Sequence, residues 1–372
     1  MSLIATAQVA TRKGLFTIER RDSGWAITGL AFAGDNVPMV LARGETVLAA
    51  LGHGHFGVKV HRSSDGGRSY QEVASPTYPP RPEDTEDRDP IRGTTIEWNA
   101  EMVWELAAGG ADRPGRVWAG TLPGGLFRSE DGGDSWQLMR SLWDRPERKQ
   151  WSGGGADLPG IHSVVVDPRD SRHVALGVST GGVWITDDDG QTWQLGGKGL
   201  RAEYLPPENA GDLVRQDVHR VVTCAAQPDV LWLQHHNGIF RSEDFGLSWK
   251  EITNVAPSAF GFTVAAHPRR PGTAWFIPAI KDEKRIPAEG RLIVNRTDDG
   301  GRSFTALTRG LPQSWAYDLV FRHCLDVDGS GERLLFGSTT GNLYASDDGG
   351  ESWQTVSNHL PPIYFVRFST PG

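Results

Sequence analysis

Short runs of mainly apolar residues, separated by Gly, Pro and Asp, follow one another along nearly the whole chain. The clearest group of four runs lies at 161–168, 173–180, 182–186 and 193–195. These runs are β-branched or aromatic and far too short for helices, which is typical of strands. We therefore expect a four-stranded antiparallel sheet over this segment.

The same group of four recurs before and after this segment. The predicted strands are 37–43, 46–51, 57–63 and 70–73; 102–108, 116–121, 125–129 and 136–139; 218–224, 230–236, 238–242 and 249–252; 260–268, 274–280, 291–297 and 304–307; and 317–323, 333–338, 342–346 and 353–356. Four short strands repeated about every 50 residues are typical of a β-propeller or a related array.

One short motif occurs between the third and fourth predicted strands of each group, with the form [S/T]-x-D-x-G-x-[S/T]-aromatic. One copy reads S129-E-D131-G-G133-D-S135-W136. The motif aspartates are Asp65, Asp131, Asp188, Asp244, Asp299 and Asp348. They are 66, 57, 56, 55 and 49 residues apart, which supports six copies of one structural unit.

The motif has the composition of a hairpin turn. The carboxylate can accept hydrogen bonds from its own turn, the Gly can adopt a positive φ, and the aromatic ring can return to the sheet. A calcium site is the functional alternative, but one carboxylate per turn supplies too few oxygen ligands. We therefore predict turns whose polar groups satisfy one another.

The two ends of the chain complete a seventh group. Residues 4–10, 14–20 and 22–27 match the second, third and fourth strands, whereas residues 363–368 match the first. Pairing of these ends would remove free sheet edges. We predict an all-β, seven-bladed β-propeller closed by N- and C-terminal strands that share blade 1, with residues 1–372 as a single domain.

The repeats resemble Asp-box (BNR) repeats, which occur in sialidases, two-propeller xyloglucanases, sortilin-type receptors and a photosystem assembly factor. The chain also resembles a single-propeller bacterial group labelled sialidase-like or BNR-repeat glycosyl hydrolase. That closer resemblance rests on residues 10–16, His162–Ser163, 234–238 and 260–262. It implies a propeller with Asp-box hairpins on the side away from the functional face, and it implies little about activity because the label describes the repeats.

Composition narrows the range of partners. The formal net charge is −8, which does not suit the binding of nucleic acid phosphates. No apolar run approaches the roughly 20 residues of a membrane span. The N-terminus lacks the basic start of a secretion signal, and the two cysteines, Cys224 and Cys324, fall in different blades, so we expect reduced thiols and a cytoplasmic location.

Candidate chemistry lies in the loops that a propeller brings to one face, which we call the top face. His162 and His219 occupy equivalent positions in adjacent blades, each at the second residue of the first strand. Either can serve as a base or ligand, or can simply cap its strand with a backbone hydrogen bond. We take His162, His219 and Glu101 as catalytic candidates. The ligand-binding candidates are Arg12, His53, His55, Trp98, His235, His236, Lys281, Tyr317 and Arg322.

No cofactor is predicted. A transition metal held by His162, His219 and His235 is an alternative, although no tight ligand spacing such as H-E-x-x-H supports it. His53 and His55 form an H-x-H pair that strand alternation would place on one side, but they lie in a Gly-rich turn.

A sialidase active site is not recognisable. An Arg-Ile-Pro tripeptide occurs at 285–287, in blade 6 rather than near the N-terminus as in sialidases. A glycosidase needs two carboxylates about 5–10 Å apart, for which Glu101 and Asp217 are possible. We therefore predict a hydrolase or lyase acting on a small polar or anionic ligand, with a carbohydrate-like ligand as one option. The alternative is a non-catalytic ligand- or protein-binding propeller.

One long segment, 75–99, carries the charged run R81-P-E-D-T-E-D-R-D-P-I-R. It is either a solvated loop or a lid over the top face, aided by Trp98.

Overall fold

The computed structural model describes residues 5–154 and 156–370 and consists almost entirely of strands. Seven four-stranded antiparallel sheets are the blades of an all-β propeller, as predicted. The described helical segments are short: α1 (Arg140–Trp143), η1 (Gly54–Phe56), η2 (Pro146–Gln150), η3 (Pro207–Asn209), η4 (Leu213–Arg215) and η5 (Ala288–Gly290). None of the helices in these two ranges is long and apolar enough to cross a membrane.

The chain divides into two compact units, which are described separately. Unit 1 contains residues 1–51, 61–71 and 252–372, and unit 2 contains residues 52–60 and 72–251. The prediction of a single domain over 1–372 stays a prediction.

Unit 1 contains three complete sheets. Their strands, in hydrogen-bonded order, are β28 (Ile363–Phe368), β1 (Thr6–Thr11), β2 (Gly14–Arg21) and β3 (Gly24–Ala31); β20 (Gly261–Ala266), β21 (Ala274–Pro278), β22 (Val294–Thr297) and β23 (Thr305–Leu307); and β24 (Leu325–Val327), β25 (Leu334–Gly337), β26 (Leu343–Ser346) and β27 (Gln354–Ser357). A large cluster that includes Trp275, Phe336 and Trp353 forms much of their core, and a smaller one contains Phe260 and Phe262.

Unit 2 contains three further sheets. Their strands are β8 (Met102–Ala108), β9 (Val117–Leu122), β10 (Leu126–Ser129) and β11 (Gln137–Leu138); β12 (Ile161–Val166), β13 (Val174–Val178), β14 (Gly182–Thr186) and β15 (Gln194–Leu195); and β16 (Val218–Cys224), β17 (Gln227–His235), β18 (Ile239–Ser242) and β19 (Lys250–Ile252). The seventh sheet has the order β4 (Met39–Arg43), β5 (Thr46–Gly52), β6 (Val58–Ser63) and β7 (Gln71–Val73).

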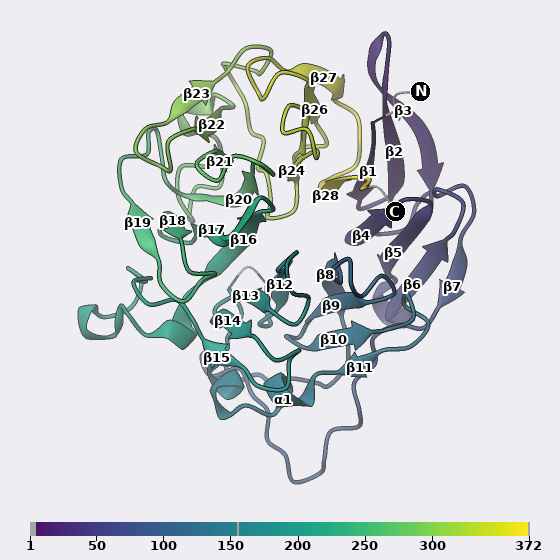
Figure 1. Ribbon diagram of the computed structural model, residues 1–372, viewed down its shortest axis with the longest axis vertical. Coiled ribbons are helices and arrows are strands. Elements are labelled where there is room, and N and C mark those ends of the chain that lie inside the picture. Colours follow the sequence, from purple (N-terminus) through teal and green to yellow (C-terminus); the bar gives the residue numbers. More distant parts are fainter. Residues whose placement is uncertain (1–4, 155, 371–372) are drawn as a thin grey trace. The chain divides into compact units, whose positions relative to one another are not determined.

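The two ends of the described chain pair with each other, as the sequence predicts. Strand β28 lies antiparallel beside β1, with Val9 opposite Val366. Figure 1 shows the yellow β28 beside the purple β1 in unit 1. The N- and C-terminal strands therefore share one blade, in which β1 is paired on both sides.

Burial is lowest in the fourth strand of a blade. In one blade of unit 2, every residue of β13 and β14 is buried and β12 is buried at four of six positions, whereas β15 has an exposed Gln194 beside a half-buried Leu195. Strands covered on both faces need continuous apolar runs. This difference explains why the fourth strands are the least clear in the sequence.

Each repeated motif forms a turn with its own hydrogen-bond network, here called an aspartate turn. In the turn at Asp131, the Ser129 hydroxyl donates to Oδ1 at 2.7 Å, the Ser135 N–H donates to the same oxygen at 2.9 Å, and the Ser135 hydroxyl donates to Oδ2 at 2.6 Å. The other five turns repeat this pattern. The prediction of self-satisfied turns is confirmed.

The aromatic residues of these turns differ in burial. Trp193, Trp249 and Trp353 are buried, whereas Tyr70, Trp136 and Phe304 are half-buried. Cys224 and Cys324 are both buried, and neither forms a disulfide bond.

One predicted strand is wrong. The first strand of the last blade was expected at 317–323, but β24 begins at Leu325. The Asp318 carboxylate instead accepts hydrogen bonds from Ser338 at 2.7 Å and Asn342 at 2.8 Å. These side-chain bonds hold the segment as a loop, because they provide local polar partners outside the strand ladder.

Candidate functional site

Two adjoining strands of unit 2 bring an aspartate and three histidines together. Asp217 lies just before β16 and His219 is its second residue, whereas His235 ends β17 and His236 follows it. Val218 pairs with His235, and the His236 N–H donates to the Asp217 carbonyl at 3.0 Å. The hairpin therefore places residues from its two strands at one end of the sheet.

A β-bulge sets the orientation of His219. Val218 pairs with His235 and Arg220 pairs with Gln234, so the pairing passes over His219. The same bulge occurs at His162 in the preceding blade and at Trp104 in the blade before it. Bulges redirect a side chain and are frequent beside active sites. The sequence prediction that His162 and His219 are equivalent is confirmed in the backbone.

The Asp217 carboxylate lies close to two imidazoles. Asp217 Oδ2 is 3.2 Å from His236 Nδ1 and 3.6 Å from His219 Nε2. The His219 and His236 rings meet edge to face, with centroids 5.6 Å apart. His219 is buried, whereas the His236 side chain is 22% exposed. We call these three residues the Asp217 cluster; it has one open side, at His236.

Hydroxyl groups from the neighbouring blade approach the same carboxylate. A Cβ atom on Gly154 would lie 2.5 Å from Thr180 Oγ1, 2.7 Å from Ser179 Oγ and 2.8 Å from Asp217 Oδ1. All three polar groups therefore converge on the backbone of Gly154, where only glycine fits. On another side, the Tyr204 ring packs edge to face on His236 at 5.2 Å.

His235 lies behind the cluster and is fully buried. The Asn237 N–H donates to its Nδ1 at 3.1 Å, so the ring proton belongs on Nε2. Burial lowers the pKa of His235 to about 3, although the charge of Asp217 opposes that shift. His235 is therefore neutral near pH 7. Within the described residues, its Nε2 has no hydrogen-bond partner.

His162 is held by the protein itself. Its Nε2 donates to the Val218 carbonyl at 2.8 Å, and its Nδ1 lies 3.1 Å from the Ser163 hydroxyl. The Trp104 ring packs against it at 5.3 Å. These bonds link β12 to β16, which is the strand-capping alternative considered for this histidine, and they engage both ring nitrogens.

The metal alternative involves different residues from those predicted. In the part of the chain that the structure describes, the group of His, Cys, Asp and Glu side chains able to hold a metal is Asp217, His219 and His236. The predicted trio of His162, His219 and His235 shares only His219 with it. Asp217, named in the sequence only as a possible glycosidase carboxylate, is the central residue. The signal in the sequence was Asp-x-His opposite His-His in one predicted hairpin.

The other predicted site residues in unit 2 are not members of the Asp217 cluster. Glu101 is exposed and precedes β8. His53 and His55 flank and form the turn η1 rather than a strand, with His53 half-buried and His55 exposed. The two histidines therefore lie in the Gly-rich turn that the sequence indicates, where strand alternation does not apply. Trp98 donates from Nε1 to Asp87 Oδ2 at 2.9 Å.

The charged segment 75–99 is not simply solvated. Asp87 and Asp89 are each only 1% exposed. Asp87 pairs with buried Arg148 at 2.7 Å, and Asp89 accepts from the Gly153 N–H at 3.0 Å. The segment is therefore docked onto 143–153 by buried carboxylates.

The remaining candidates belong to unit 1. Arg12 is exposed in the β1–β2 turn, and Lys281 pairs with Glu283 at 3.2 Å. Tyr317 is 56% exposed, whereas Arg322 is only 4% exposed, with its guanidinium 5.5 Å from the Phe262 ring centroid. Arg322 therefore packs in the interior of this unit rather than presenting its charge at the surface.

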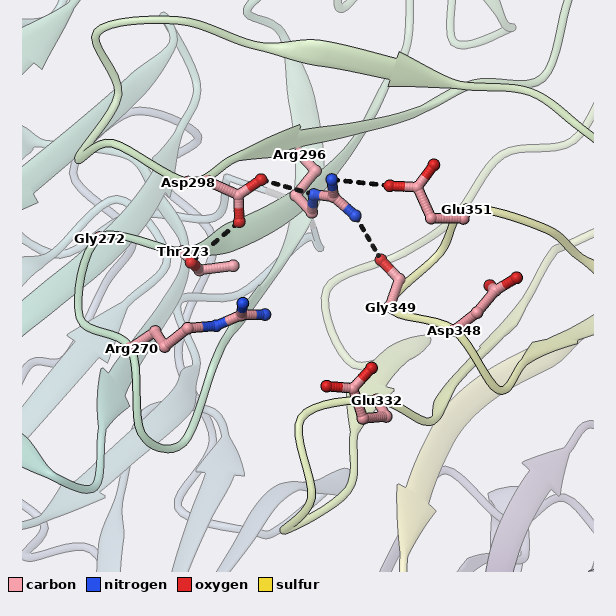
Figure 2. Close-up of a pocket in the computed structure, with 9 residues that line it drawn as sticks. All are labelled: Arg270, Gly272, Thr273, Arg296, Asp298, Glu332, Asp348, Gly349 and Glu351. Atoms are coloured by element: carbon pink, nitrogen blue, oxygen red, sulfur yellow. Dashed lines mark hydrogen bonds and ion pairs between the residues drawn. The ribbon is translucent and has the colours of Figure 1, made fainter.

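A polar hollow of about 310 Å³ lies in unit 1, among the aspartate turns. It is lined by Arg270, Gly272, Thr273, Arg296, Asp298, Glu332, Asp348, Gly349 and Glu351. Arg296 lies between Asp298 and Glu351 (Figure 2). Its guanidinium pairs with each carboxylate at 2.8 Å and also donates to the Gly349 carbonyl at 3.2 Å.

The same link recurs in unit 2. There the Arg128 guanidinium donates to the Asp189 carbonyl at 3.1 Å, at the equivalent motif position. The hollow is therefore a variation of a repeated blade-to-blade contact. It contains none of the predicted catalytic residues, and the Asp217 cluster remains the better candidate for chemistry.

Comparison with known proteins places the chain among propellers. No protein-family model matches it. An oligoxyloglucan-reducing end-specific xyloglucanase of Emericella nidulans is 24% identical over 261 residues, which cover 66% of this chain and 26% of that protein. A xyloglucanase of a Paenibacillus species is 25% identical over 247 residues, or 58% of this chain and 21% of that protein. The chain thus spans about a quarter or less of these curated relatives.

Solved structures share the fold at lower identity. An ancestral GH74 enzyme has a TM-score of 0.56 at 17% identity, over 90% of this chain and 38% of that one. YCF48 bound to a D1 peptide has a TM-score of 0.52 at 13% identity, and the match covers 88% of this chain and 84% of that one. A functionally unknown protein from Desulfotomaculum acetoxidans has a TM-score of 0.58 at 8% identity, and the match covers 99% of both chains. At these identities the likeness establishes the propeller fold alone.

Proposed function

We propose that the chain is a hydrolase or lyase that acts on a small polar or anionic, carbohydrate-like ligand at the Asp217 cluster. The observation that carries the proposal is one carboxylate within 3.2 and 3.6 Å of two imidazole nitrogens, with His236 partly open to solvent. A histidine oriented by a carboxylate is the usual acid–base unit of hydrolytic sites.

The residues around the cluster have distinct parts in this proposal. His236 is the group that a ligand reaches first, because it is the exposed member. Asp217 orients the imidazoles and stabilises a positive charge on either of them. Ser179 and Thr180 are buried, and their hydroxyls converge on Gly154 beside the carboxylate, so they pack against the cluster from the side away from solvent.

The comparisons support the class of ligand. Two curated relatives are named for action on xyloglucan, and a solved propeller is an ancestral GH74 enzyme. The resemblance to Asp-box glycosyl hydrolases from the motifs points in the same direction. This chain spans only about a quarter of those relatives. The resemblance therefore supports the class of ligand, whereas the cluster supports the acid–base chemistry.

The proposal is tested with a panel of chromogenic probes: nitrophenyl glycosides, nitrophenyl phosphate, nitrophenyl acetate and xyloglucan oligosaccharides. We expect His219→Gln and His236→Ala to lower kcat/KM for the hydrolysed probe by at least ~100-fold. The matched control is His173→Ala, which removes another histidine whose Nδ1 lies 3.2 Å from an aspartate Oδ2, that of Asp167. Equal activity in all three variants would refute the assignment.

A binding module is the second candidate, and one observation favours it. Trp315 is 85% exposed and Tyr317 is 56% exposed in the same loop of unit 1. Exposed aromatic residues are enriched at sites of recognition, and the propeller YCF48 was solved with a bound peptide. If Trp315→Ala abolishes binding of a ligand or protein partner while His236→Ala does not, this second candidate is favoured.

A further inference from the structure

We propose that Asp217, His219 and His236 bind a divalent transition-metal ion. The inference deepens the proposed function and rests on it for the use of the ion in chemistry, whereas binding itself is measured without a substrate. Two imidazoles and one carboxylate are a ligand set that suits zinc, iron or cobalt rather than magnesium or calcium.

Two of the three separations between ligand atoms are close to those of a coordination shell. The candidate ligand atoms of the three residues all lie within 4.8 Å of one another. Bonds of about 2.0–2.1 Å in a tetrahedral site place ligand atoms roughly 3.3 Å apart. The observed distances from Asp217 Oδ2, 3.2 Å to His236 Nδ1 and 3.6 Å to His219 Nε2, lie close to that value.

The backbone holds the three ligands in place before any ion arrives. The bulge at His219 and the hydrogen bond from the His236 N–H to the Asp217 carbonyl join the two ligand-bearing segments. The Asp217 and His219 side chains are at most 9% exposed, and Gly154 approaches the carboxylate closely. Little ordering entropy is therefore lost on binding, which favours affinity.

The site also keeps an approach for a ligand. Three protein ligands with one open position are the arrangement of catalytic rather than structural zinc sites. The 22% exposure of His236 supplies that opening. A bound ion would act there as a Lewis acid toward a polar or anionic ligand.

The test uses the full chain, stripped with a chelator and then dialysed against buffered Zn²⁺, with metal content determined by elemental analysis. Co²⁺ serves as a second probe because its visible spectrum reports the ligand geometry. We expect one ion per wild-type chain. We expect Asp217→Asn and His236→Ala to weaken Zn²⁺ binding by at least ~100-fold, since loss of a direct ligand should exceed the 10–100-fold effect of losing an outer partner.

The matched control is again His173→Ala, whose Nδ1–Oδ2 distance to Asp167 equals that of His236 to Asp217. It should retain one ion per chain. Substoichiometric binding by the wild type, or wild-type affinity in both Asp217→Asn and His236→Ala, would overturn the inference. If Asp217→Asn does not fold by circular dichroism, His236→Ala decides, because that side chain is partly exposed.

The outcomes separate the two proposals. Zinc bound by the cluster without turnover of any probe would refute the proposed hydrolase while leaving the metal site in place. Turnover that depends on His219 but is unaffected by chelation, in a protein that binds no stoichiometric zinc, would refute the metal site and leave the hydrolase.

Discussion

Replacing Asp87 with alanine should strongly destabilise unit 2, because it leaves a buried guanidinium without its charge partner. Arg148 is 6% exposed and Asp87 is 1% exposed. Two hydrogen bonds join them, at 2.7 and 3.3 Å. Arg148 also donates to the Trp143 carbonyl at 2.7 Å and lies over that ring, so its position is fixed and it cannot readily turn to water.

The magnitude follows from the cost of an uncompensated buried charge. Removing one partner of a buried ion pair typically costs about 3–5 kcal/mol. The hydrogen bond from Trp98 to Asp87 is also lost, but Trp98 is half-buried and can reach water, so we add nothing for it. For a chain of 372 residues, this loss corresponds to a fall in Tm of roughly 4–6 °C.

Urea denaturation followed by tryptophan fluorescence measures the effect. Asp144→Ala is the control: Asp144 forms an exposed pair with Arg140 at 2.7 Å, and its loss should cost less than ~0.5 kcal/mol. The double variant Asp87→Leu with Arg148→Met should be less destabilised than Asp87→Ala, since no buried charge remains. A loss below ~1 kcal/mol for Asp87→Ala with an unchanged m-value would refute the reasoning.

Two further predictions concern the turns. Gly341 has a φ of +86°, and a Cβ there would lie 1.9 Å from the Leu360 carbonyl oxygen, so Gly341→Ala should lower the free energy of unfolding by at least ~2 kcal/mol. A Cβ on Gly211 would meet open space, so Gly211→Ala should leave stability unchanged. Equal shifts in Tm for the two variants would contradict this prediction. The hydrogen bond from the Ser135 hydroxyl contributes most to lowering the pKa of Asp131 to about 2, from 3.8. The stabilising effect of the ionised Asp131 carboxylate should therefore be complete above about pH 4 and lost toward pH 2. The difference in Tm between wild type and Asp131→Asn should close as the pH falls through that range. A constant difference would show that ionisation of Asp131 is not the source of the stabilisation.

Local patterns in the sequence predict most of the fold. Strand positions follow from short apolar runs and from glycine and aspartate at the turns, which are properties of neighbouring residues. Pairing of β1 with β28 also follows, since each end lacks the strands that the other supplies. The first strand of the last blade was misplaced because the Asp318 side chain, through contacts with Ser338 and Asn342, holds that segment out of the ladder.

The sequence by itself also determined that His162 and His219 are equivalent, since both are at the second position of a first strand. The sequence could not determine which of the two histidines hydrogen-bonds to the backbone of another blade, because that contact joins segments from different blades. His162 reaches the Val218 carbonyl of the next blade, whereas His219 lies beside Asp217 and His236 of its own.

The burial of Asp87 is also determined by the tertiary structure and not by the local sequence. Its charged segment looks solvated in sequence, but Arg148, 61 residues later, makes an ion pair with it in the interior. Periodicity and turn composition reflect the local backbone, so they determine strands, turns and the repeat. Which polar side chains meet depends on distances between segments remote in sequence, and only the folded chain sets those.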